Sequence, residues 1–375
     1  MKILFLSGAL EPGKDGVGDY TRTLATECTR LGHETFLLSL NDPWIDAPLN
    51  EQREVRLGAK LSWPNRLKFA KIFVTEIRPD MVSLQFVPYS FHPAGLSFAL
   101  PQLLRACIGR IQTQVMFHEI WIGEQTDASR NARVIGFCQR KIIEGMVKSL
   151  TCQAIHTSNP VYIYLLTRRG IDAKHLPLFG SVPVVQVEKF PRRNDNVLRL
   201  GMFGSIHPEW SPDELFVQLL NLHKPIQLSH IGRIGPGESV WMNLAERYGS
   251  MIDIQRLGER SLEDISRFFS SIDFGVSTTP QSLIGKSSSV AAMLDHGLPV
   301  IVNRNDVHFR GVPETALTSE LLIPLDKAFL ERLRLASTRR QSPKPRLPEV
   351  AEQFLREIGT GIRSSGVAGV QELQK

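Results

Sequence analysis

The sequence lacks several features that would by themselves define a protein class. It holds only four cysteines among 375 residues, and no two of them have the spacing of a zinc site. No apolar run approaches the roughly 18–20 residues that a membrane-spanning helix requires. No internal repeat or low-complexity tract occurs. These absences argue against a zinc module, a transmembrane protein and a repeat protein, and they predict free thiols in a reducing compartment.

The composition is that of a globular protein with a substantial core. The apolar share is 42%, the charged share is 22%, and the length suits two domains. The formal net charge of +6 is dispersed, which suggests anionic ligands or an anionic surface without requiring nucleic acid. The apolar start is too short for a signal peptide because Glu11 and Lys14 follow at once. We therefore expect a cytoplasmic protein, or one at the inner face of a membrane.

Apolar, β-branched segments alternate with amphipathic helical segments along the chain, a pattern typical of parallel sheets covered on both faces. It predicts an α/β protein with two doubly wound Rossmann-like domains in series. The first domain is expected over 1–186, the second over 197–340, and a tail with one more amphipathic helix over 341–375. The polar segment 187–196 is the expected linker.

A glycine-rich segment, Gly13-Lys-Asp-Gly-Val-Gly-Asp-Tyr20, follows the first expected strand and opens the first expected helix. We expect a loop over 13–18, whose glycines permit a tight turn and a close approach to a ligand. The spacing differs from Gly-x-Gly-x-x-Gly, which argues against nicotinamide binding. A plain strand-to-helix turn is the alternative interpretation.

A second segment, over 284–300, predicts a loop, a helix over 287–296 and a strand. Its run Gly-Lys-Ser-Ser-Ser (285–289) combines unpaired N–H groups at a helix start with hydroxyls and one cation. Such groups hold a phosphate or diphosphate. The alternative is a merely structural loop and helix.

Both segments resemble those of GT-B glycosyltransferases of family 4, and the resemblance covers nearly the whole chain. Gly16, Gly18 and Gly32-His33-Glu34 match the family's first loop and second strand. The stretch Ala292–Val300 looks like the family's Glu-Ala-Met-Ala-x-Gly-x-Pro-Val. The resemblance implies the GT-B fold with a C-terminal helix returning to the first domain. It also implies a nucleotide-sugar donor, retention of the anomeric configuration, and no metal or other cofactor.

The resemblance also assigns roles to residues. His118 ends a strand of the first domain and would contact the transferred sugar as the catalytic residue, with a structural histidine as the alternative. Arg233 is a candidate donor contact, although a solvated loop position is favoured. The expected donor-binding residues are Gly16, Gly18, Gly204, Ser205, Arg233, Gly285, Lys286, Ser287, Ser288 and Ser289. The candidate acceptor contacts are Asp19, Tyr20, Gln85 and Tyr89. Tyr20, Gln85 and Tyr89 are expected on loops, together with His92, a further candidate.

The sequence departs from the family at the donor site. The two glutamates of the family's Glu-x7-Glu motif fall on Ile284 and Ala292, which cannot accept a hydrogen bond from a hydroxyl through their side chains. Ser205 and Trp210 stand in place of two cations for the donor phosphates. Lys286 adds a cation and makes the site more electropositive.

These observations predict a glycosyltransferase that moves a sugar from a nucleotide-sugar donor to an unidentified glycan, lipid-linked or small-molecule acceptor. One alternative is a non-catalytic GT-B protein that binds a ligand or a partner enzyme. Another is a GT-B sugar-nucleotide epimerase. The segment Arg66–Phe73 mixes cations with apolar residues. A core-packing helix with a solvated basic edge is favoured there over contact with anionic lipid.

Overall fold

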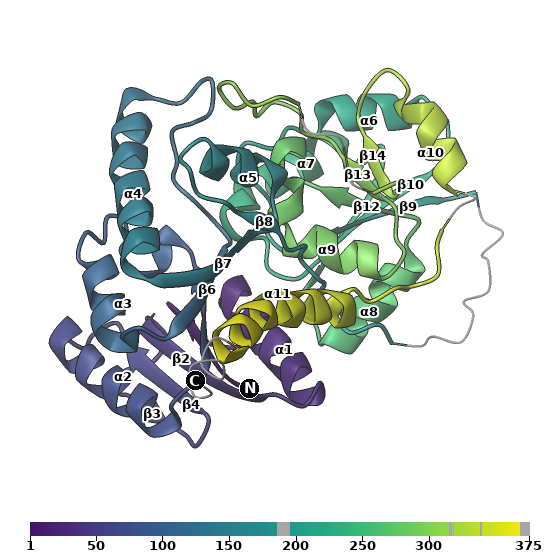
Figure 1. Cartoon of the computed structure of the whole chain (residues 1–375). Helices are drawn as coiled ribbons and strands as arrows, with labels where there is room; N and C mark the ends of the chain where they lie inside the picture. Colours follow the sequence, from purple (N-terminus) through teal and green to yellow (C-terminus); the bar gives the residue numbers. More distant parts are fainter. Residues whose placement is uncertain (186–195, 315–316, 318, 338–339, 368–375) are drawn as a thin grey trace, which may run out of the picture. The chain divides into compact units, whose positions relative to one another are not determined.

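The computed structural model describes residues 1–185, 196–314, 317, 319–337 and 340–367 (Figure 1). The chain divides into two compact units. Unit 1 contains Met1–Pro177, Phe309–Val312 and the segment from Leu347 onward, and unit 2 contains Leu178–His308 and Pro313–Arg346. Residues 187–195 of the expected linker lie outside the described residues.

The described residues of unit 1 form an eight-stranded sheet in the order β3-β4-β2-β1-β5-β6-β7-β8. All neighbouring pairs are parallel except β3 and β4. The strands are β1 (Lys2–Ser7), β2 (Glu34–Asp42), β3 (Leu49–Asn50), β4 (Glu54–Gly58), β5 (Met81–Phe86), β6 (Gln112–Phe117), β7 (Thr151–Thr157) and β8 (Lys174–His175). The helices are α1 (Gly16–Arg30), α2 (Trp63–Ile77), η1 (Pro88–Ser90), α3 (Leu100–Ile108), α4 (Arg130–Ser149), α5 (Pro160–Thr167) and α11 (Leu347–Val367).

Helix α11 belongs to unit 1 although it lies near the end of the chain. Its Phe354 is fully buried and stacks on Phe5 of β1, with ring centroids 5.8 Å apart. Gln153 of β7 donates a hydrogen bond of 2.6 Å to the backbone oxygen of Ile358. The expectation of a C-terminal helix that returns to the first domain is therefore confirmed.

Unit 2 has a parallel six-stranded sheet in the order β11-β10-β9-β12-β13-β14. Its strands are β9 (Leu198–Phe203), β10 (Ile226–Ile231), β11 (Asp253–Gly258), β12 (Phe274–Ser277), β13 (Val300–Val302) and β14 (Leu322–Pro324). Its helices are α6 (Asp213–Leu220), η2 (Gly235–Gly237), α7 (Glu238–Tyr248), α8 (Leu262–Ser271), η3 (Gln281–Lys286), α9 (Ser288–Asp295) and α10 (Phe329–Ser337).

Apolar clusters cover both faces of the unit 2 sheet. Along β13, Val300 and Val302 join the cluster built with α8 and α9, while Ile301 joins the cluster built with α6, α7 and α10. Alternate residues of a strand point to opposite faces, so this strand is buried on both sides. The doubly wound architecture expected from the sequence is confirmed in both units.

Two local expectations are wrong. The glycine segment is not a loop throughout, because α1 begins at Gly16, and Asp15 caps it by accepting a hydrogen bond from the Val17 N–H. The expected loop before α9 is the short 3-10 helix η3. Among the described residues, no helix combines the length and the apolar character that crossing a membrane requires.

Candidate functional site

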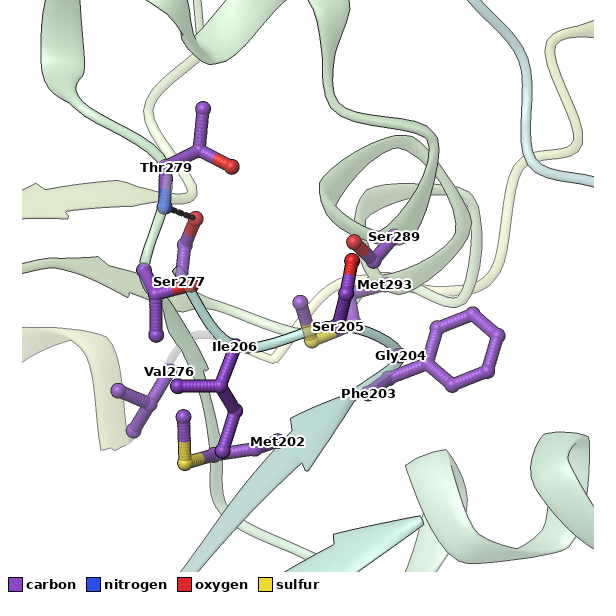
Figure 2. A pocket seen from close by; sticks show the side chains of 11 residues that line it. Met202, Phe203, Gly204, Ser205, Ile206, Val276, Ser277, Thr279, Ser289 and Met293 are labelled. Atoms are coloured by element: carbon purple, nitrogen blue, oxygen red, sulfur yellow. Dashed lines mark hydrogen bonds between the residues drawn. The ribbon is translucent and has the colours of Figure 1, made fainter. Parts of the chain in front are cut away.

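A pocket lies in unit 2 at the carboxyl ends of β9 and β12. Strand β9 stands between β10 and β12, so the chain reverses its direction across the sheet at this point. In open α/β sheets, ligands bind at the carboxyl ends of the strands beside such a reversal. The pocket is lined by Met202, Phe203, Gly204, Ser205, Ile206, Val276, Ser277, Thr278, Thr279, Ser289 and Met293 (Figure 2).

The local backbone explains why hydroxyl groups gather there. Gly204 turns the chain at the end of β9 with a φ of +78°, a conformation that side-chain-bearing residues rarely adopt. A Cβ atom added to Gly204 would lie 4.0 Å from Oγ of Ser289, so the turn after β9 lies against the start of α9. Figure 2 shows Ser205, from this turn, beside Ser289.

Helix α9 begins at this pocket. Ser287 is its N-cap and accepts a hydrogen bond of 3.3 Å from the Val290 N–H. The first N–H groups of a helix have no acceptor within the helix, and the helix dipole favours negative charge there. Ser289 lies in this first turn and lines the pocket. The arrangement is suited to an anionic group such as a phosphate.

Two cations lie close enough to His207, which follows β9, to influence its pKa. Burial lowers the pKa of His207, the positive charges of Arg304 and Lys286 lower it further, and Glu209 and Asp306 oppose them. Arg304 is almost fully buried and pairs with Asp306 at 2.6 Å. Its Nη1 atom is buried without a partner among the described residues. Lys286 and Arg304 therefore place positive charge near the same turn of the chain.

Arg233 has a different environment. Its guanidinium is about half exposed and pairs with Glu259 at 3.0 Å. Of the other expected donor-binding residues in unit 2, Arg233, Gly285, Lys286, Ser287 and Ser288 do not line the pocket. The solvated loop position that the sequence favoured for Arg233 agrees with this exposed pair.

The positions aligned with the family's glutamates face apolar surroundings. Ile284 packs against the apolar cluster of α8 and α9. Ala292 is fully buried, and a Cβ atom on Gly180 would lie only 2.6 Å from its Cα. The backbone of Gly180 thus occupies the space beside Ala292 that a longer side chain would need.

In unit 1, His118 follows β6 and is mostly buried. Its Nε2 atom shares a hydrogen bond of 2.8 Å with Oε1 of Gln85, and its ring meets that of Tyr20 edge-on at 4.8 Å. Burial lowers the pKa of His118 to about 3, so its imidazole is neutral. Tyr20 and Gln85 are themselves buried, on α1 and β5, so the expected loop positions for these two are wrong.

The start of α1 carries negative charge. Asp15 caps the helix, and Asp19 accepts a hydrogen bond of 2.9 Å from the Gly13 N–H. Burial raises the pKa of both carboxyl groups. A Cβ atom on Gly18 would lie 3.1 Å from the Ala9 oxygen, so this glycine is needed for packing. A diphosphate contact at Gly16 and Gly18 stays a prediction, one that the two carboxylates oppose.

The structure thus places Gly204, Ser205 and Ser289 in one pocket and joins His118 to Gln85 and Tyr20. Tyr89 lies exposed in η1 and stays a predicted acceptor contact. The sequence interpretation missed Thr278, His207 and Arg304. All three lie within four residues of the carboxyl end of a strand of the parallel sheet, which is the signal that could have identified them.

No known protein-family profile and no curated protein matches this chain. Solved structures do match over nearly its whole length. The lipopolysaccharide outer core galactosyltransferase WaaB is 15% identical, with a TM-score of 0.54, covering 97% of this chain and 100% of that one. HepE from Anabaena, in complex with UDP and glucose, is 13% identical (TM-score 0.57; 96% and 99% covered). MnaA from S. aureus, solved with UDP, is 12% identical (TM-score 0.55; 97% of each chain covered). The likeness establishes the GT-B fold.

Proposed function

We propose that this GT-B chain is a glycosyltransferase that uses a UDP-sugar donor. The observation that carries the proposal is the hydroxyl-lined pocket between β9 and β12, against the first turn of α9. It offers backbone N–H groups, the hydroxyls of Ser205 and Ser289, and a glycine turn that lets a ligand approach the backbone. The UDP bound to HepE and to MnaA supports uracil as the base of the donor nucleotide.

In the proposed reaction, the bond between the anomeric carbon and the diphosphate oxygen breaks. A new bond forms to an acceptor oxygen, whose proton passes to the departing diphosphate. Negative charge grows on that diphosphate, and preorganised N–H groups and cations stabilise it by several kcal/mol. The start of α9 and Lys286 would supply this stabilisation without a metal. Attack and departure on one face of the sugar retain the anomeric configuration and need no dedicated protein base.

His118 would contact the transferred sugar. Its imidazole is neutral, so it can exchange a hydrogen bond with a sugar hydroxyl without adding charge. Because Tyr20 and Gln85 are buried against it, they would hold His118 in place and would not touch an acceptor. Asp19 and Tyr89 remain the candidate acceptor contacts.

The acceptor is proposed to be a glycan, a lipid-linked saccharide or a small molecule. One surface supports peripheral contact with a membrane. On α2, Phe69 and Ile72 are nearly half exposed beside the exposed Lys68 and Lys71. Apolar side chains among cations are suited to anionic lipid, whereas Arg66 of the same helix is buried and bonds to Asn41.

The test is isothermal titration of the protein with UDP and with uridine. UDP should bind, and Ser289→Asp should weaken it about tenfold or more, because a carboxylate at the pocket repels the diphosphate. Uridine binding should change little. The matched control is Ser250→Asp, the same substitution at an exposed position that precedes β11, at the opposite edge of the sheet. If millimolar UDP does not bind the wild type, or Ser289→Asp leaves its affinity unchanged, the proposed donor site is wrong.

A second candidate function is that of a non-catalytic GT-B protein. It is favoured by the two aligned positions, where the buried Ala292 and the partly buried Ile284 carry no carboxylate. Such a protein would bind UDP without releasing sugar from any UDP-sugar. Slow hydrolysis of a UDP-hexose above the uncatalysed rate, lost in Ser289→Asp and kept in Ser250→Asp, would decide for the transferase.

A further inference from the structure

A continuous row of hydrogen bonds runs through the interior of unit 1, from His118 to the C-terminal helix. We call it the buried relay, and it consists of His118, Gln85, Ser83, Gln114, His156 and Glu357. The successive side-chain distances are 2.8, 2.7, 2.6, 3.0 and 2.6 Å. The first five residues are at most 8% exposed, and the Glu357 side chain is 17% exposed.

The relay crosses three neighbouring strands. Gln85 and Ser83 lie two residues apart on β5 and so share one face, and Ser83 is the direct register partner of Gln114 on β6. His156 lies on β7, and Glu357 reaches it from α11. Polar side chains inside a parallel sheet are costly unless every one of them is hydrogen-bonded. Their uninterrupted pairing therefore calls for an explanation beyond packing.

The carboxylate at one end sets the direction of the whole row. An ionised carboxylate only accepts hydrogen bonds, so His156 must donate its Nε2–H to Glu357. Burial lowers the pKa of His156 although Glu357 opposes this, so the imidazole is neutral and its Nδ1 accepts from the Gln114 amide. Burial tends to raise the pKa of Glu357, but the hydrogen bonds from His156 and Gln353 and the nearby charge of Lys174 together lower it, which keeps the carboxylate ionised.

Each later bond follows from the one before. Because the Gln114 nitrogen donates to His156, its oxygen must accept from the Ser83 hydroxyl. The Ser83 oxygen then accepts from the Gln85 nitrogen, and the Gln85 oxygen must accept from Nε2–H of His118. No member of the row can reverse alone without leaving two donors or two acceptors face to face.

We infer that Glu357, through the buried relay, fixes His118 in its Nε2–H tautomer and leaves Nδ1 as the hydrogen-bond acceptor. Glu357 is thus a positioning residue for His118, five hydrogen bonds away on a helix from the other end of the chain. In the transferase, and resting on that proposed function, Nδ1 would accept a hydrogen bond from a hydroxyl of the transferred sugar. A deoxy sugar lacking that hydroxyl would be a poor donor.

The experiment is nitrogen-15 NMR of the full-length protein with labelled histidine, which distinguishes the two neutral tautomers. The His118 signals are assigned with His118→Ala. Wild type should show His118 as Nε2–H without any ligand. Glu357→Lys should convert it to Nδ1–H, because a lysine only donates and would reverse every bond of the row. An Nδ1–H tautomer in the wild type would overturn the inference.

Two variants serve as controls. Glu357→Gln still offers an accepting oxygen and should keep the wild-type tautomer. Glu352→Lys makes the same charge change at an exposed position of α11 and should also leave His118 unchanged. If Glu357→Lys does not fold, Ser83→Ala breaks the row at its centre and should give a mixture of both tautomers. An unchanged tautomer in the folded Glu357→Lys or Ser83→Ala variant contradicts the inference.

The tautomer is measured in the free protein, so the result is independent of whether UDP binds or sugar is transferred. Once a donor is identified, Glu357→Lys should lower kcat about tenfold or more while UDP affinity stays unchanged. Glu352→Lys should have the wild-type kcat. A converted tautomer with unchanged kcat would mean that the relay sets the tautomer of His118 but that this tautomer does not affect sugar transfer.

Discussion

At the scale of single residues, charge compensation is the main feature of unit 2. The two cations that the family resemblance leads one to expect are replaced by Ser205 and by Trp210, which is buried. Lys286 and Arg304 come from two other segments, and the positive charge of each lowers the pKa of His207. Arg304 is tied to Asp306, so its charge is largely neutralised locally. Lys286 directly precedes Ser287, the N-cap of α9, and is therefore the better candidate to meet a diphosphate.

Lys286→Ala should weaken the binding of UDP about tenfold or more and leave uridine almost unaffected, because a hydrogen bond to a charged group contributes about 1.5–3 kcal/mol. Titration calorimetry measures both affinities. Lys286→Arg should recover most of the loss. Lys224→Ala removes an exposed cation before β10 and should change neither affinity. An equal loss for both ligands would mean that Lys286 supports the fold and not the phosphate.

At the scale of elements, the regular strands and helices follow from the sequence. Six elements have the bounds that apolar periodicity and the flanking turn residues predict, namely β1, β5, β9, β10, α7 and α8. Strand β4 was missed because its Arg56 is buried, paired with Asp42 at 2.8 Å, and a charge inside a strand hides the apolar pattern. Strand β14 was missed because three residues carry too short a pattern.

The candidate site was only partly predictable for a related reason. Gly204, Ser205 and Ser289 lie in recognisable turn and helix-start patterns, so the sequence identified them. The buried relay draws its members from β5, β6, β7 and α11, and no spacing along the chain reveals that they meet. The sequence also could not show that Ala292 packs against the Gly180 backbone, because the two residues are far apart along the chain.

Restoring the family's glutamate should not restore a site. Ala292→Glu would force a charged side chain into a fully buried position against the Gly180 backbone, lowering the free energy of unfolding by about 3 kcal/mol or more. Urea denaturation measures the change. Ile284→Glu, at a partly buried position, should be milder. A stable Ala292→Glu variant with tighter UDP binding would contradict this prediction, because it would show that the backbone around Gly180 can move to accommodate the glutamate.

At the scale of the whole molecule, buried histidines occur in both units. Burial lowers the pKa of His118 and His156 in unit 1 and of His230 and His296 in unit 2. The unfolded chain binds protons at these rings below pH 6.5, and the folded chain resists doing so. Their contribution to stability is therefore complete above that pH and is lost as the pH falls toward the lowered values.

The pH dependence gives a measurable contribution from His118. Between about pH 7.5 and about pH 5.5, this one ring should account for about 1.4 kcal/mol of the lost unfolding free energy, since its folded pKa lies well below that window. The loss in urea-denaturation experiments should be smaller by that amount in His118→Gln than in the wild type. His223→Gln, at an exposed position, should retain the wild-type loss. An identical loss in His118→Gln would mean that the folded protein protonates this ring.

Helix α11 also has a consequence for synthesis on the ribosome. Its buried Phe354 and Ile358 cover part of the unit 1 sheet. However, roughly 170 residues separate Pro177, where the first segment of unit 1 ends, from Leu347, where α11 begins. At about 5–20 residues per second, the nascent first unit waits on the order of 10–35 s for its last helix. During that interval the apolar surface around Phe5 stays uncovered. The emerging chain is therefore an expected client of chaperones that bind exposed apolar surface until α11 has been synthesised.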